Sequence, residues 1–119
     1  MSNEKPVMYH NPSCSKSRET LQILQDNNVE PTIIEYLAQP PSAQELRTII
    51  SLLGITARDL LRTTEQVYKD AKLDDDSLSE DEIIETICAF PVLLQRPIVI
   101  ADGKAIIGRP PVKVLEIIA

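Results

Sequence analysis

A reactive thiol is the chemistry that residues 9–18 offer most directly. The segment reads Tyr-His-Asn-Pro-Ser-Cys-Ser-Lys-Ser-Arg, so Cys14 lies between an apolar run that ends at Tyr9 and a stretch with helical periodicity. A thiol at the start of a helix lies among unpaired backbone N–H groups and near the positive end of the helix dipole, and both favour the nucleophilic thiolate. Lys16 and Arg18 add positive charge nearby. We therefore predict that Cys14 is a nucleophile.

Burial as a small hydrophobic residue is the simpler interpretation of a lone cysteine. For Cys14 the flanking Ser, Lys and Arg residues favour a solvated turn instead. The other cysteine, Cys88, continues an apolar helical stripe with Ile84 and Ile87. A thiol in apolar surroundings has a raised pKa and reacts poorly, so we predict no role for Cys88.

Composition limits the partners and the setting. The chain has 119 residues with 43% hydrophobic and 25% charged residues, as expected of one globular domain. Its net charge of −6 argues against nucleic acid as a partner. Two cysteines are too few for a disulfide framework, and no apolar run is long enough to span a membrane. We expect a cytoplasmic monomer without a metal site, and we interpret the acidic run at 74–76 as a solvated loop.

Strands and helices alternate at the beginning of the chain. The apolar and helical patterns predict a strand over residues 5–9, a helix over 15–27 and a second strand over 32–36. Such a βαβ unit places its two strands parallel, with a right-handed crossover. The helix therefore begins directly after the turn that holds Cys14.

Helices occupy the middle of the chain. The capping-box pattern Ser-x-x-Glu occurs at residues 42–45 and again at 79–82. Apolar positions at helical spacing follow both boxes, and shorter helical pieces are predicted over 56–62 and 65–71. We expect this helical block to extend from about residue 42 to 90.

The last part of the chain returns to strands. The residues predict a strand over 97–100, an Asp-Gly hairpin turn at 102–103 and an antiparallel strand over 105–107. A final helix is expected after Gly108, with prolines in its first turn.

The order β-α-β, helical block, β-β-α is that of a thioredoxin-like α/β fold with a mixed four-stranded sheet. We therefore predict a single domain over residues 1–119, with a helical insertion at about 42–90. In this fold a proline before the third strand faces the cysteine and usually follows a cis peptide bond. The bond between Arg96 and Pro97 is therefore predicted to be cis.

Three arginines stand at the edges of predicted elements. Arg62 ends a helix, Arg96 precedes a strand and Arg109 follows one. The planar guanidinium donates two parallel hydrogen bonds and suits tetrahedral oxyanions, although arginines at such positions also form weak surface ion pairs. We predict that some of the three converge on Cys14, with Arg18 on the helix as an alternative.

The resolving thiol is not beside the nucleophile. A thioredoxin-type motif would read Cys-x-x-Cys, whereas residues 14–17 read Cys-Ser-Lys-Ser. The thiol that releases the Cys14 adduct must be Cys88, a small thiol such as glutathione, or another protein. Because Cys88 is predicted to lie on a helix face, we favour an external thiol.

These motifs together resemble the glutaredoxin-coupled arsenate reductases over nearly the whole chain. The segments that carry the resemblance are His10-Asn11-Pro12-Ser13-Cys14 with Ser17-Arg18, residues 30–37, Leu60-Leu61-Arg62, Arg96-Pro97-Ile98-Val99 and Gly108-Arg109-Pro110.

The resemblance implies a reaction. The cysteine matching Cys14 attacks arsenate, glutathione attacks the adduct, arsenite leaves, and glutaredoxin reduces the mixed disulfide. Glutathione is a co-substrate, and no cofactor is bound. The implied oxyanion ligands are Arg62, Arg96 and Arg109, the implied regulator of the thiol pKa is His10, and the supporting residues are Asn11, Ser17, Arg18 and Pro97.

Three alternatives stay open at this point. His10, the only histidine of the chain, is also consistent with a hydrogen-bonded turn residue. The thiol chemistry is compatible with another glutathione-linked substrate, such as a glutathionylated protein. A regulator resembling Spx, which binds RNA polymerase, would share the fold, although such regulators usually carry the Cys-x-x-Cys switch that this chain lacks.

Overall fold

The computed structural model describes residues 5–118, so residues 1–4 and 119 of the predicted domain lie outside the described part. The chain forms two compact units. The sheet unit combines the residues up to 39 with those from 96 onwards, and the helical unit covers residues 40–95. The helical unit is slightly longer than the predicted insertion at 42–90. That the two units form a single domain stays a prediction.

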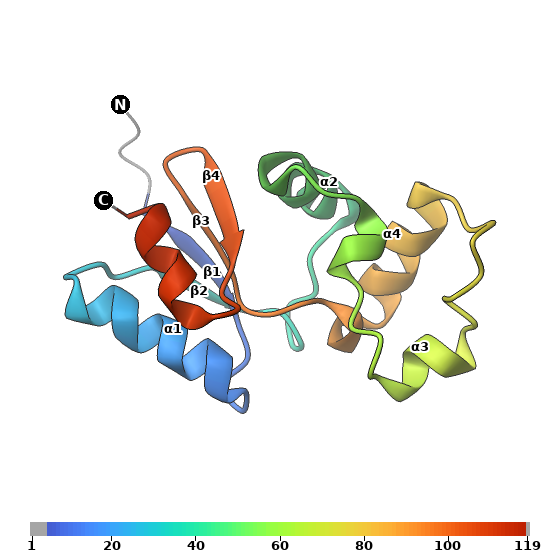
Figure 1. Cartoon of the computed structure of the whole chain (residues 1–119), viewed down its shortest axis with the longest axis horizontal. Helices are drawn as coiled ribbons and strands as arrows, with labels where there is room; N and C mark the ends of the chain where they lie inside the picture. Colours follow the sequence, from blue (N-terminus) through green and yellow to red (C-terminus); the bar gives the residue numbers. More distant parts are fainter. Residues whose placement is uncertain (1–4, 119) are drawn as a thin grey trace. The chain divides into compact units, whose positions relative to one another are not determined.

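The sheet unit contains a mixed four-stranded sheet, in the order β2-β1-β3-β4 (Figure 1). The neighbours β1 and β2 are parallel, and both pairs that involve β3 are antiparallel. The predicted α/β class and mixed sheet are therefore confirmed. The elements are β1 (Val7–His10), α1 (Ser15–Asp26), β2 (Thr32–Glu35), β3 (Ile98–Ala101) and β4 (Lys104–Ile107).

Four chain segments meet at one edge of the sheet, where β1, β2 and β4 end and β3 begins. His10 at the end of β1 is aligned with Glu35 at the end of β2. Tyr9 is aligned with Ile98, the first residue of β3, and Ile98 with Ile107, the last residue of β4. The segments that follow β1, β2 and β4 and the segment that precedes β3 therefore meet at the same edge.

Two helices cover one face of the sheet. α1 packs side by side with η3 (Pro111–Glu116), a 3₁₀-helix (Figure 1). The buried residues between them and the strands form one hydrophobic cluster, which contains Met8, Leu24, Val99, Ala101, Val114 and Ile117. This apolar layer holds α1 against β1 and β3.

The last helix differs from the prediction that it begins directly after Gly108. It begins only at Pro111, and Pro110 is extended with ψ 160°. The reason is steric, because a residue that precedes proline is disfavoured in the helical region. Arg109 precedes Pro110 and Pro110 precedes Pro111, so the first of the two prolines cannot join the helix.

The Asp-Gly hairpin between β3 and β4 is present as predicted. Asp102 has φ 51° and Gly103 has φ 73°. A type I′ turn requires positive φ at both central residues, a conformation that glycine adopts without cost and aspartate tolerates. The turn pairs Ala101 with Lys104 and thereby sets the register of β4.

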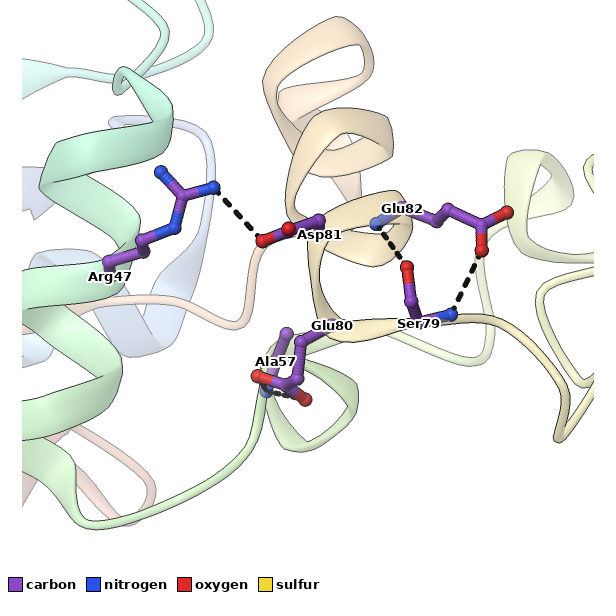
Figure 2. A network of polar contacts seen from close by, with 6 residues as sticks. All are labelled: Arg47, Ala57, Ser79, Glu80, Asp81 and Glu82. Carbon is purple, nitrogen blue, oxygen red and sulfur yellow. Dashed lines mark hydrogen bonds and ion pairs between the residues drawn. The ribbon is translucent and has the colours of Figure 1, made fainter.

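The helical unit contains α2 (Ala43–Leu53), η1 (Ala57–Leu60), α3 (Gln66–Asp70), α4 (Glu80–Ala89) and η2 (Pro91–Leu93). Both predicted capping boxes are formed. In the second, the Ser79 hydroxyl accepts a hydrogen bond from the Glu82 N–H, and the Glu82 carboxylate accepts one from the Ser79 N–H, each at 3.1 Å (Figure 2). Ser42 and Glu45 make the same pair of contacts at the start of α2.

The first turn of α4 also connects the helices of this unit (Figure 2). Asp81 forms an ion pair of 3.0 Å with Arg47 on α2. The Glu80 carboxylate accepts hydrogen bonds of 3.1 Å from the N–H of Ala57, at the start of η1. Among the described residues, none of the helices is long and apolar enough to span a membrane.

Candidate active site

Cys14 is the N-cap residue of α1, the position predicted for it. Its backbone is extended, its N–H donates to the Asn11 carbonyl at 3.0 Å, and its own carbonyl accepts from the Arg18 N–H at 3.0 Å. The side chain is partly exposed. The sulfur therefore lies at the positive end of a 12-residue helix and remains accessible to a reaction partner.

The turn before Cys14 is fixed by its own side chains. Asn11 Oδ1 accepts a hydrogen bond of 3.0 Å from the Ser13 N–H, which closes an Asx turn. From the helix, Arg18 Nη1 donates to the Pro12 carbonyl at 2.9 Å. Arg18 thus contacts the turn, in keeping with a supporting residue.

Ser17 joins the end of β1 to the first turn of α1. Its Oγ lies 2.6 Å from Nδ1 of His10 and accepts a hydrogen bond of 3.0 Å from the Asn11 N–H. All three residues are buried. His10 and Ser17 are therefore brought together beside the Cys14 turn.

The environment of Cys14 favours the thiolate on balance. Burial raises the pKa of the Cys14 thiol, but the Arg96 side chain and the backbone N–H groups of Ser17 and Lys16 outweigh it, so the pKa lies below its ordinary value. The nucleophilic form is thereby enriched near neutral pH. The backbone N–H groups act as the sequence predicted, whereas the side-chain charges of Lys16 and Arg18 are not among the causes of the lowered pKa.

Arg96 reaches Cys14 from the segment that precedes β3. The Arg96–Pro97 peptide bond is cis, as predicted. Burial disfavours the charged guanidinium, yet interactions with Cys14 and Tyr36 raise the pKa of Arg96 above its ordinary value. Of the three predicted oxyanion ligands, Arg96 is the one for which a contact with the Cys14 thiol is shown.

Arg109 is hydrogen-bonded to the segment that precedes β3. Its Nε donates to the Arg96 carbonyl at 2.8 Å, while the Gly108 N–H donates to the Pro97 carbonyl at 2.9 Å. A Cβ on Gly108 would lie 2.6 Å from Thr20 Oγ1 and 2.8 Å from Pro97 Cγ, so only glycine fits between helix and proline. This close approach places Arg109 beside the backbone of Arg96.

Arg62 belongs to the helical unit. Its N–H donates to the Leu93 carbonyl at 2.7 Å, and its Nε lies 3.7 Å from a Glu65 carboxylate oxygen. Its predicted part in binding an oxyanion stays a prediction.

Cys88 has the opposite electrostatic setting to Cys14. Burial raises the pKa of the Cys88 thiol, and the Glu85 and Glu45 carboxylates act in the same direction against Arg47. Such a thiol is a poor nucleophile near neutral pH, in agreement with the absence of a predicted role.

Sequence reasoning missed Tyr36, the residue directly after β2. Its phenol interacts with Arg96 and Asn11, and the charge of Cys14 influences its pKa. The signal that could have found it is topological. The carboxyl ends of parallel strands lie at the same edge of a sheet, so a polar side chain that follows β2 is a neighbour of the turn that follows β1.

The pH dependence of stability provides a test of the His10 environment. Burial lowers the pKa of His10 below 6.5, with Arg18 acting in the same direction and Glu35 against it. Because the unfolded chain then binds the proton more tightly, stability is complete above about pH 6.5 and is lost as the pH falls through the native pKa. We expect the free energy of unfolding of the wild type to fall more than that of His10→Asn between pH 7.5 and 5.5.

Urea unfolding at the two pH values measures this difference. Since His10 is the only histidine of the chain, NMR of its imidazole protons gives the native pKa directly. A midpoint at or above 6.5 would contradict the prediction.

Comparison with known proteins identifies the family of this chain. The ArsC family model matches residues 9–117. The Escherichia coli (strain K12) protein YfgD is 52% identical over 112 residues, which cover 93% of this chain and 94% of YfgD. A Haemophilus influenzae protein named arsenate reductase is 46% identical, over 94% of this chain and 97% of its own.

A solved structure gives the same result for the fold. The structure titled arsenate reductase from Vibrio cholerae superposes with a TM-score of 0.94 at 42% identity, and the match covers 98% of this chain and all of that one. The predicted thioredoxin-like fold is thereby confirmed. From the family match over residues 9–117 and from relatives of this similarity over nearly the full length, the chain belongs to the ArsC family.

Proposed function

We propose that this protein reduces arsenate to arsenite, with Cys14 as the nucleophile and with glutathione and glutaredoxin as the source of electrons. The observation that carries the proposal is the Cys14 thiol at a helix N-terminus, with a lowered pKa and the Arg96 side chain beside it. The names of the Haemophilus and Vibrio relatives support arsenate as the substrate.

The first step forms a bond between sulfur and arsenic. The Cys14 thiolate attacks As(V), and one arsenate oxygen takes up protons and leaves as water. Arginine guanidinium groups suit the remaining oxygens, because they stay charged and donate paired hydrogen bonds. In this proposal the oxyanion ligands are the three arginines that the resemblance implies, Arg62, Arg96 and Arg109.

The second step transfers two electrons to arsenic. Glutathione thiolate attacks the Cys14 sulfur, a disulfide forms, and the electron pair of the broken S–As bond remains on arsenic. As(V) becomes As(III), and arsenite leaves. Glutaredoxin then reduces the Cys14–glutathione disulfide by thiol–disulfide exchange, which restores the Cys14 thiol.

An external thiol is part of the proposal because the chain offers no suitable internal one. The fourth residue of the Cys14 motif is Ser17, whose hydroxyl is engaged with His10 and Asn11. Cys88 has a raised pKa. We also propose that the protein acts in the cytoplasm, where thiol reductants keep such cysteines reduced.

Arsenite release from arsenate by the purified protein tests this proposal. The assay contains glutathione, glutaredoxin and a system that regenerates reduced glutathione, and each component is omitted in turn. We expect turnover only in the complete mixture. Turnover with thioredoxin but not with glutaredoxin would mean that thioredoxin, and not glutaredoxin, is the electron donor.

The absence of turnover with any thiol donor would remove arsenate as the substrate. If the Cys14 pKa is then found to be low, a glutathionylated protein becomes the substrate to test. If that pKa is also ordinary, the search turns to a binding role of the kind seen in polymerase regulators.

A further inference from the structure

We propose that Tyr36 is a positioning residue, whose buried phenol oxygen holds the Arg96 guanidinium against the Cys14 sulfur. The inference deepens the proposed function, on which its effect on arsenate turnover rests. Its effect on the thiol itself does not depend on the identity of the substrate.

The position of Tyr36 follows from the sheet topology. It is the first residue after β2, and β2 is parallel to β1, with His10 aligned with Glu35. Tyr36 therefore lies at the edge of the sheet where the Cys14 turn begins. Its side chain is 0% exposed and is one of the largest fully buried side chains among the described residues.

The phenol oxygen is a buried polar atom without a hydrogen bond of good geometry to any described residue. Such atoms are rare in folded proteins, and each one calls for an explanation. The groups that interact with this phenol are Arg96 and Asn11, and Cys14 acts on it through its charge. The oxygen thus lies within the site and not in the apolar core.

Arg96 connects Tyr36 to Cys14. Both the Cys14 thiol and the Tyr36 phenol interact with its side chain. A guanidinium is a rigid plane, so polar groups packed against it on two sides restrict its rotation. Without the phenol oxygen the plane can turn, and the thiolate loses part of its stabilisation.

The ionisation state of Tyr36 suits this role. Burial raises the pKa of the Tyr36 phenol above its ordinary value. The group therefore stays protonated near neutral pH and presents an oxygen to Arg96 without a competing negative charge beside the thiolate. A carboxylate in its place would attract the guanidinium away from the sulfur.

The replacement Tyr36→Phe keeps the ring and removes only the oxygen. The rate of alkylation of Cys14 by iodoacetamide, measured against pH in a Cys88→Ser background, gives the thiol pKa without any arsenate. We expect the titration midpoint to rise by about one unit, which is about a tenfold fall in the thiolate fraction near neutral pH. Arsenate kcat/KM is expected to fall with it.

Tyr9→Phe is the matched control. Tyr9 is also buried in the sheet unit, at 4% exposure, but unlike Tyr36 it is not among the groups that act on the pKa of Arg96. We expect the thiol midpoint to be unchanged in this variant. In an Arg96→Lys background, Tyr36→Phe should add no further shift, since the two residues act through one contact.

An unchanged midpoint in a folded Tyr36→Phe protein would overturn the proposal, and so would an equal shift in Tyr9→Phe. If Tyr36→Phe does not fold, the wild type provides the test through NMR of ring-labelled tyrosine, assigned with Tyr9→Phe and Tyr68→Phe. The Tyr36 Cζ shift should follow the Cys14 titration, and a pH-independent shift would overturn the proposal. A positive result without arsenate turnover would leave the positioning role intact and remove only the substrate.

Discussion

Replacing Cys14 by serine is expected to abolish arsenate turnover, with a loss of about a thousandfold or more, as for the removal of other catalytic nucleophiles. A serine hydroxyl stays protonated near neutral pH, and the interactions of Arg96, Ser17 and Lys16 that favour the thiolate cannot produce an equivalent alkoxide. The measurement is arsenite release in the complete assay, with circular dichroism to establish that the variant is folded.

Cys88→Ser is the matched control, because it makes the same change at the other cysteine. Turnover is expected to stay within about twofold of the wild type, since the raised pKa of Cys88 makes it a poor nucleophile. A folded Cys88→Ser protein without activity would mean that Cys88 is the resolving thiol, and the glutathione step would have to be revised.

Arg96→Lys is expected to lower kcat/KM by about a hundredfold, the order of effect seen when one donor to a developing oxyanion is removed. Lysine keeps the charge but not the planar pair of donors. Because Arg96 also lowers the pKa of Cys14, the thiol titration should move upward in the same variant. Steady-state kinetics and alkylation against pH measure the two effects separately.

Arg47→Lys provides the control for this change. Arg47 forms an ion pair with Asp81, and both side chains are largely exposed, at 46% and 72%. Exposed ion pairs of this kind contribute little to stability. The kinetics and the Cys14 pKa of Arg47→Lys are therefore expected to match those of the wild type. If Arg96→Lys behaved like Arg47→Lys, Arg96 would have no part in the site.

Local signals in the sequence predicted much of this fold. The capping boxes at Ser42 and Ser79 and the Asp102-Gly103 turn depend on residues within four positions of one another, and all are present in the structure. Cys14 at the N-terminus of a helix is a signal of the same kind. The cis bond before Pro97 was instead predicted from the order of elements, because the fold places a proline there.

The parts that were missed depend on contacts distant in sequence. Tyr36 and Cys14 are separated by the whole of α1, and only the pairing of β1 with β2 brings their surroundings together. The late start of η3 at Pro111 was readable from the two adjacent prolines, but the prediction assigned both of them to the first turn of the helix. The role of Arg62 is also a question of tertiary contacts, which spacing along the chain does not address.

The division of the chain into two units has a consequence for its evolution. The groups that lower the pKa of Cys14 all belong to the sheet unit, in the first turn of α1 and directly before β3. Substitutions within residues 40–95 replace none of these groups. The strength of the nucleophile is therefore encoded in the sheet unit, so that a lineage can vary its helical unit without exchanging any group that makes the thiol reactive.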